Sequence, residues 1–292
     1  MATLHRSRRN AALALLGFAL IGATQPPGPD ASFARLRSDD LKLATVALRL
    51  AEANVSRCAE SMPATGQVIA AIDQYPPEAR ARAAGELGFT STIGIETVVP
   101  GSPAERAGVQ AGDGLLEVEF LGLSKLEPSP TATSISRDAA ERLIAAFPPG
   151  EDMNLLVSRS GQAIALKLKP MPACRVRSEV IQSDIPVSRS DGTMIQLSSG
   201  FIETFGEDAV AVAFAHELAH TVLHHGTKAS KRNEREADRL SVHLLATAGY
   251  DPRIAPRFWR EHGASMGTRG HDSVQDRIKL LEAEIAAMGA ER

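Results

Sequence analysis

The sequence predicts an α+β fold in which a small barrel-like β module precedes a mainly helical domain with a small β-sheet. Between about residues 85 and 170, short runs alternate apolar and polar residues and are broken by Gly and Pro. From about residue 207 onward, apolar residues recur at helical spacing. The length of 292 residues favours two domains as a prior.

Residues 1–23 are predicted to be a secretory signal peptide. Arg6, Arg8 and Arg9 precede an apolar run over 11–23 that ends in small residues. The competing interpretation is an uncleaved membrane anchor, but this run is shorter than the roughly 20 residues that a spanning helix needs. We therefore expect export, cleavage and a soluble mature chain.

Net charge and cysteine content limit the classes of binding partner and the cellular compartment that we expect. The formal net charge of −3 gives no reason to expect nucleic acid or an anionic membrane surface as a partner. Cys58 and Cys174 are the two cysteines, and in an exported chain two cysteines usually pair. The alternative is two buried free thiols. No Cys-x-x-Cys spacing is present, so these residues are not expected to form a zinc site.

Residues 24–84 are predicted to be a linker followed by a helical segment. The Pro- and Gly-rich stretch 24–30 is typical of a linker. Residues 38–60 carry apolar side chains at helical spacing, and a second helix is expected to begin at the proline pair near Pro76. Neither helix contains residues with evident chemistry.

Residues 85–172 are predicted to form the barrel-like module. A short amphipathic helix is expected over 136–147. Residues 153–170 favour a β-hairpin that turns at Ser160-Gly161. A helix between such strands gives a compact α+β module.

This module resembles the PDZ domains of bacterial proteases. The resemblance rests on Val-Val-Pro-Gly-Ser-Pro-Ala at 98–104, Ala-Gly-Val at 107–109 and Gly-Asp at 112–113. It implies peptide binding by strand addition, with backbone N–H groups holding a terminal carboxylate. The Glu-Leu-Gly-Phe segment 86–89 is similar to the carboxylate-binding loop, which implies peptide-binding roles for Leu87, Gly88 and Phe89. Alternatively, the groove is closed and the module only packs on its neighbour.

Residues 173–292 are predicted to form the last domain. Strands joined by a Ser190-Asp191-Gly192 turn come first. Helices are expected at about 207–225, 230–248, 253–263 and 273–288. Gly249 stands where the end of the second helix is expected.

The segment His216-Glu217-Leu218-Ala219-His220 has the H-E-x-x-H spacing on a predicted helix. Four residues make just over one turn, so both imidazoles leave one face of the helix and can bind one ion. Glu217 lies slightly off that face, where it can reach a water on the metal. A catalytic zinc ion still needs a third protein ligand and one open position.

Two sources of the third ligand can be tested on the sequence. The metzincin pattern requires glycine at 223 and histidine at 226, and the chain has Leu223 and Gly226. A glutamate from a second, antiparallel helix fits better. If the chain reverses direction near residue 227, residues equally far from that point on the two helices lie opposite each other. Glu234 then lies opposite His220, and Asp238 lies opposite His216. Asp238 can then accept the other ring N–H of a ligating histidine. Glu236 is expected to point away as a solvated charge.

These motifs identify a second resemblance. The segments HELAH, EREAD and AGYDP are similar to the minigluzincin peptidases of the HtpX, Ste-type prenyl-protease and Oma group, peptidase family M-forty-eight. The resemblance covers about 175–290 and implies a zincin fold with one zinc ion per chain. The link between the two motifs is shorter here than in many relatives. The roles that it implies are zinc ligands at His216, His220 and Glu234, a catalytic Glu217 and an outer aspartate at Asp238.

The final loop differs from that family, because Asp272 replaces a proline after His271. His271 is interpreted either as an oxyanion-stabilising or regulatory residue, or as an exposed side chain. Arg277 is likewise interpreted either as a residue of the site or as a structural residue. His224 and His225 are expected to cap the end of the first helix of the site.

The function predicted from the sequence is that of an exported, periplasmic zinc metalloendopeptidase of the HExxH, gluzincin type. It would hydrolyse peptide bonds of unfolded or damaged envelope proteins, with the PDZ module recruiting or regulating. Substrate is expected to lie along an edge strand near residues 194–200. The alternative is an inactive, zinc-stabilised PDZ protein that binds peptides or acts like a chaperone and has no need of Glu217.

Overall fold

The computed structural model describes residues 33–123, 126–225, 230–266 and 272–290. The predicted signal peptide, 1–23, and His271 lie outside these ranges. Within them, no helix combines the length and the apolar character that crossing a membrane would require.

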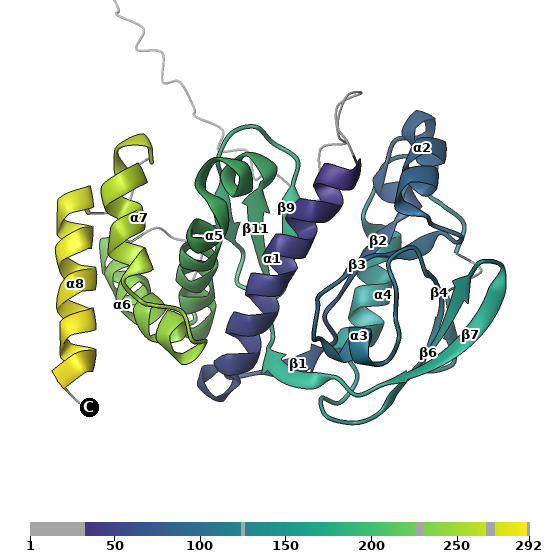
Figure 1. Cartoon of the computed structure of the whole chain (residues 1–292), viewed down its shortest axis with the longest axis horizontal. Coiled ribbons are helices and arrows are strands. Elements are labelled where there is room, and N and C mark those ends of the chain that lie inside the picture. Colours follow the sequence, from purple (N-terminus) through teal and green to yellow (C-terminus); the bar gives the residue numbers. More distant parts are fainter. Residues whose placement is uncertain (1–32, 124–125, 226–229, 267–271, 291–292) are drawn as a thin grey trace, which may run out of the picture.

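Two parts of the molecule lie side by side (Figure 1). The central part, residues 61–172, is built on a sheet. The helical part consists of the N-terminal helix α1, Phe33–Ala53, and residues 173–290. Helix α1 runs between the two parts in Figure 1.

The central part contains a sheet with strand order β2-β3-β4-β6-β7 and a short strand, β5, paired with β4. Its helices are α2, α3 and α4, and the β6–β7 hairpin turns at Ser160 and Gly161, both with positive φ, as predicted. The expected helix over 136–147 is α4. The bounds are β2 Gln67–Ala71, α2 Pro77–Leu87, β3 Ile93–Val98, α3 Pro103–Arg106, β4 Gly114–Val118, β5 Leu121–Gly122, α4 Ile135–Ala145, β6 Met153–Arg159 and β7 Gln162–Leu168.

The sheet of the central part starts earlier in the chain than the predicted boundary at residue 85. Strand β2 pairs antiparallel with β3, and a short 3-10 turn, Ile72–Gln74, and α2 lie between them. Residues 61–84 are therefore more than a helical segment. A short apolar run such as 67–71 cannot be assigned to strand or helix by periodicity alone, and only its pairing decides.

The chain enters and leaves the central part at one place. Strand β1, Ser61–Ala64, pairs antiparallel with β8, Met171–Cys174. The predicted disulfide between Cys58 and Cys174 is present, with Cα atoms 5.5 Å apart. The central part is thus an insertion between α1 and the rest of the helical part, tied at its base by two strands and one disulfide.

The helical part begins with a small sheet of order β10-β11-β9 and continues with the remaining helices. All four helices agree closely with the predicted ranges, because α5 is kinked at Gly206 (φ 77°, ψ −175°) and its longer part begins after that residue, as predicted. The bounds are β9 Arg177–Ile181, β10 Ser188–Ser190, β11 Met194–Ser198, α5 Ser199–Val222, α6 Lys231–Thr247, α7 Ile254–His262 and α8 Val274–Ala290, with short 3-10 turns at Val55–Arg57 and Gly263–Ser265.

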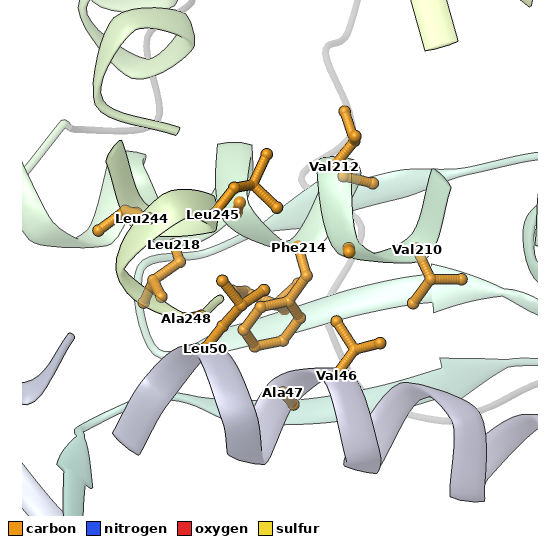
Figure 2. Close-up of a cluster of buried hydrophobic side chains, with 14 of the residues drawn as sticks. Val46, Ala47, Leu50, Val210, Val212, Phe214, Leu218, Leu244, Leu245 and Ala248 are labelled. Atoms are coloured by element: carbon orange, nitrogen blue, oxygen red, sulfur yellow. The ribbon is translucent and has the colours of Figure 1, made fainter. Parts of the chain in front are cut away.

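The core of the helical part is shared by helices distant in sequence. Val46 and Leu50 of α1 meet Phe214 of α5, while Leu244 and Leu245 come from α6 (Figure 2). Full burial of an aliphatic or aromatic side chain of this size contributes about 1.5–3 kcal/mol. Helix α1 is therefore part of this core, although the whole central part separates it from α5 in the sequence.

Small residues explain how α5 lies so deep. Its residues 209–215 and 218–219 are all buried, and alanine supplies about half of them. Small side chains let neighbouring helices and strands approach the backbone closely. The polar residues of the predicted site consequently project from a helix held rigidly on several sides.

The sheet corrects one expectation about substrate position. Strand β11, which contains the segment near 194–200, is the middle strand and is buried along its length. The edge strand on the side of α5 is β10. Because β11 pairs with β10 on one side and with β9 on the other, it has no free edge to which a substrate strand could be added.

Candidate functional site

Helices α5 and α6 bring the two predicted motifs together. The His216 Nε2 and His220 Nε2 atoms lie 3.1 Å apart. Glu234 Oε2 lies 3.2 Å from His216 Nε2 and 3.4 Å from His220 Nε2. This trio is the one group of potential metal ligands found among the described residues.

The spacing of these three atoms fits a zinc ion. Zinc binds histidine nitrogen and carboxylate oxygen at about 2.0–2.2 Å in tetrahedral geometry, which separates neighbouring ligand atoms by about 3.3 Å. The three observed separations all lie within about 0.2 Å of that value. Two imidazoles and one carboxylate are also the donor set of a catalytic zinc site with one open position.

Asp238 lies behind His216, one turn of α6 beyond Glu234. Its Oδ1 is 3.0 Å from His216 Nδ1. Arg277 of α8 donates to both carboxylate oxygens of Asp238, with Nε–Oδ2 at 2.8 Å. The Arg277 guanidinium lies 3.7 Å above the ring of Trp259. The outer carboxylate is therefore fixed from a third helix.

The charges of this group shift one another's pKa. Burial lowers the pKa of His216, but hydrogen bonds to Asp238 and Glu234 outweigh it and raise the value to about 9. Burial raises the pKa of Asp238, and the contacts with His216 and Arg277 bring it below its usual range. In the metal-free chain a proton on His216 balances the two carboxylates. A bound cation would take the place of that proton.

Glu217 leaves α5 beside the trio and meets the edge strand. Its Oε1 accepts a hydrogen bond from Ser188 Oγ of β10 at 3.0 Å. The carboxylate is therefore held between the histidine pair and the open edge of the sheet. It is placed to exchange a proton with a water near the ligand atoms.

The histidines after the site do more than cap the helix. The His225 ring contacts the His220 ring, with the two Nδ1 atoms 3.0 Å apart. His225 Nε2 lies 3.2 Å from Glu236 Oε2, so Glu236 is not merely a solvated charge. His224 adopts a left-handed conformation at the helix end.

The loop before α8 is tied to α6 by Asp272. Arg235 donates to Asp272, with Nε–Oδ2 at 2.5 Å. The Asp272 carboxylate thus holds this loop against α6, the helix that carries Glu234. His271 precedes it and lies outside the described residues, so its role stays a prediction.

In the predicted carboxylate-binding segment, the side chains of Leu87 and Phe89 are buried, whereas Gly88 between them is exposed. Leu87 and Phe89 are buried together with Phe33 and Tyr75. Gly88 ends α2 with φ of 76°. None of the three residues of this segment lines the cavity of about 160 Å³ that lies between α1, β2 and α4. Their role in peptide binding stays a prediction.

Ion pairs join the central part to the sheet of the helical part. Arg137 of α4 pairs with Glu179 of β9 at 2.5 Å. Glu179 accepts from Gln196 of β11, which in turn accepts from Arg189 of β10 at 2.8 Å. This chain of contacts runs from α4 to the strand that carries Ser188.

Several residues of the site gave no clear signal in the sequence. Ser188, Arg277 and His225 each contact a predicted site residue from an element whose position depends on packing. One clue existed for His225, since it follows the H-E-x-x-H motif closely. No spacing rule connects Ser188 to Glu217 across 29 residues.

Comparisons with known proteins identify the central part. Residues 94–119 match the PDZ domain family. One similar solved structure is the HtrA-type protease AlgW with a decapeptide, at 24% identity and a TM-score of 0.29; the match covers 38% of this chain and 30% of that chain. A second is the HtrA3 PDZ domain bound to a phage-derived ligand, at 20% identity and a TM-score of 0.28; the match covers 39% of this chain and 89% of that chain. A third is a serine endoprotease from Yersinia pestis, at 28% identity and a TM-score of 0.22; the match covers 32% of this chain and 33% of that chain. No curated protein matches the chain.

The chain covers about a third of AlgW and of the Yersinia enzyme. The resemblance of residues 85–170 to a PDZ domain is confirmed by the family match. The predicted enzyme class, a zinc metalloendopeptidase of the HExxH, gluzincin type, is not borne out: the similar proteases are described as an HtrA-type protease and a serine endoprotease. The central part therefore contains a PDZ domain.

Proposed function

We propose that this PDZ-containing, protease-related protein binds one zinc ion at His216, His220 and Glu234 and uses this centre to hydrolyse polypeptides. We assign the chain to no class of zinc peptidase. The observation that carries the proposal is the convergence of three ligand atoms at 3.1–3.4 Å, with a carboxylate beside them. Two imidazoles and a carboxylate at this spacing are what a zinc site requires, whereas burial of charge alone is not.

The residues of the chain have separate roles in this chemistry. A zinc ion held there would lower the pKa of a bound water toward about 7 and polarise a carbonyl. Glu217 accepts the proton of that water and later returns it to the leaving amine. Ser188 keeps the Glu217 carboxylate turned toward the site. Asp238 holds the ring of His216 through its other nitrogen.

We propose that substrate lies as an extended segment along β10. This strand is at the edge of its sheet, and its first residue contacts Glu217. An extended segment that pairs with an edge strand gains backbone hydrogen bonds regardless of its sequence. That favours unfolded polypeptides over folded proteins as substrates.

We propose that the PDZ domain serves the same polypeptides as a recruiting or regulatory module. Its helix α4 lines the cavity beside β2 and α1, and the same helix pairs with Glu179 of the sheet that includes β10. A peptide captured by the domain would thus lie next to the helical part.

We also propose that the protein works in an oxidising compartment, the bacterial periplasm. The Cys58–Cys174 disulfide supports this, because structural disulfides persist outside reducing compartments. Fractionation of cells that express the full chain should place it with periplasmic markers. Retention in the cytosolic fraction would contradict export.

The decisive experiment measures zinc content and cleavage of unfolded casein by the full chain, with and without 1,10-phenanthroline. We expect one zinc per chain and cleavage that the chelator abolishes. Glu234→Ala should lose zinc and activity together. Glu217→Gln should keep zinc and lose at least about 100-fold in rate, the lower range for general acid–base catalysis. Glu207→Ala, an exposed change on α5, is the matched control.

The outcomes separate the two functions. Zinc binding without any cleavage would favour a zinc-stabilised peptide-binding or chaperone-like protein. Unchanged zinc content in Glu234→Ala would remove the assignment of the third ligand. Full activity of Glu217→Gln would remove the proposed base.

A further inference from the structure

The two histidines of the centre are held in different ways on their outer sides. His216 Nδ1 meets the carboxylate of Asp238 directly at 3.0 Å. Within the described residues, His220 Nδ1 meets no carboxylate and instead lies 3.0 Å from the Nδ1 atom of another imidazole, His225. Beyond it, His225 Nε2 lies 3.2 Å from Glu236 Oε2.

The end of α5 places His225 in this position. The N–H of His224 donates to Thr221 O, and the N–H of His225 donates to His220 O at 3.0 Å. With His224 in the left-handed region, φ 54°, these two bonds form a Schellman motif. The motif folds the chain back over the last turn, so the side chain of His225 lies against that of His220. The His225 side chain is only 8% exposed.

With a metal bound to His220, the protons shared by His220, His225 and Glu236 can be assigned in one way. A ring nitrogen that binds a metal must offer a lone pair, so a neutral His220 that uses Nε2 carries its proton on Nδ1. His225 Nδ1 must then accept, which puts the His225 proton on Nε2. Glu236, an acceptor when ionised, takes that proton in a hydrogen bond. Arg232 donates to the other oxygen of Glu236 at 2.8 Å.

We propose that His225, oriented by Glu236, is the positioning residue of the ligand His220. It accepts the Nδ1–H of His220 and so fixes both the tautomer and the orientation of that ring. This inference rests on the zinc site of the proposed function. Outer partners of metal-binding histidines typically contribute 10–100-fold to metal affinity.

The experiment measures zinc affinity of the full chain by competition with a chromophoric chelator. His225→Phe keeps a ring but removes the acceptor, and it should weaken zinc binding by about 10–100-fold. His225→Asn places an amide oxygen near the lost nitrogen and should restore most of the affinity. Glu236→Gln should lower affinity less than His225→Phe does. His224→Gly keeps the left-handed turn, removes a neighbouring imidazole and should leave affinity unchanged.

A second readout follows the tautomer. Long-range nitrogen–proton NMR spectra of zinc-loaded protein should show the His220 proton on Nδ1 in the natural chain. Thermal melting of the metal-free variants identifies any that fail to fold, and Glu236 is exposed enough for its variant to fold normally.

The results distinguish this inference from the zinc site itself. Equal zinc affinity in His225→Phe and the natural chain would overturn the positioning role and leave the site intact. Failure of His225→Asn to improve on His225→Phe would reduce His225 to a packing residue and overturn it as well. A natural chain that binds no zinc would overturn both proposals.

Discussion

Two clusters of buried charge in this molecule differ in geometry rather than in composition. The metal-centre cluster contains His216, Glu234, Asp238 and Arg277, and the interface cluster contains Glu96, Arg137, Glu141, Arg177 and Glu179. Both combine carboxylates with cationic side chains in a poorly hydrated environment. In the first, three ligand atoms converge on one point. In the second, each arginine spans two elements and faces a carboxylate.

The difference shows that burial of charge does not by itself mark a metal site. In the interface cluster, acidic groups outnumber arginines, and burial raises the pKa of Glu96 to about 7 despite Arg37 and Arg137. In the metal-centre cluster, contacts lower the pKa of Asp238. One cluster has the geometry that a bound cation requires, and the other joins the PDZ domain to the helical part.

Removing Arg277 should have the largest effect on stability. Arg277→Ala leaves Asp238 buried with one partner fewer, and breaking a buried pair in this way costs about 3–5 kcal/mol. Urea denaturation of the metal-free protein measures the loss. Arg260→Ala breaks an exposed pair with Glu282 and should cost less than about 1 kcal/mol. Equal losses in the two variants would show that the Asp238 pair is not effectively buried.

Cutting the disulfide tests how far the interface cluster depends on a covalent tie. Cys58→Ser with Cys174→Ser should reduce the free energy of unfolding by about 4 kcal/mol, because the bond closes a loop of 116 residues in the unfolded chain. Zinc content of the folded variant should not change, since neither sulfur contacts the metal centre. Zinc loss in a variant that remains folded would show that the two regions are coupled.

The acidic side of the interface cluster predicts a pH effect. The pKa of Glu96 is near 7 in the folded chain and about 4.5 unfolded, so between these values the folded state binds the extra proton. The contribution of Glu96 to the free energy of unfolding is fully present below about pH 4.5. It falls by about 3 kcal/mol as the pH rises to 7. Glu96→Gln should therefore stabilise the protein at pH 8 relative to pH 5. Glu86→Gln, an exposed change in the same domain, should show no such difference.

The partly exposed pair between Arg177 and Glu141 should give the smallest effect. These atoms lie 2.8 Å apart, but the side chains are 30% and 23% exposed, so solvent screens the attraction. Arg177→Gln should cost about 1 kcal/mol, and added salt should diminish that cost. A loss as large as that of Arg277→Ala would show that the interface cluster is as tightly organised as the metal centre.

Local patterns were sufficient for several elements and for the ligand trio. The helical periodicity of 230–248 and 253–263 predicted α6 and α7 within one or two residues, because a long amphipathic segment has one way to bury its apolar face. Glu234 could be placed by counting residues, since two antiparallel helices with a short link restrict which positions are level. The Ser160-Gly161 turn followed from residues that tolerate positive φ.

Other features depended on contacts between distant segments. The position of β2 in the PDZ sheet and of α1 in the helical core required partners far along the chain. The edge strand was misplaced because a hydrophobic run indicates a buried strand without showing where in its sheet the strand lies. The closed position of Leu87 and Phe89 likewise depends on α1, which covers them through Phe33.

The sequence by itself predicted the helices of the site and the closeness of His216, His220 and Glu234, and it favoured the pairing of Cys58 with Cys174. These features depend on helical spacing, on the length of one link and on the number of cysteines. Only the tertiary structure decided that Ser188 faces Glu217, that Arg277 holds Asp238 and that His225 supports His220. Such contacts join separate elements, and their geometry arises from packing, which no periodicity in a single chain records.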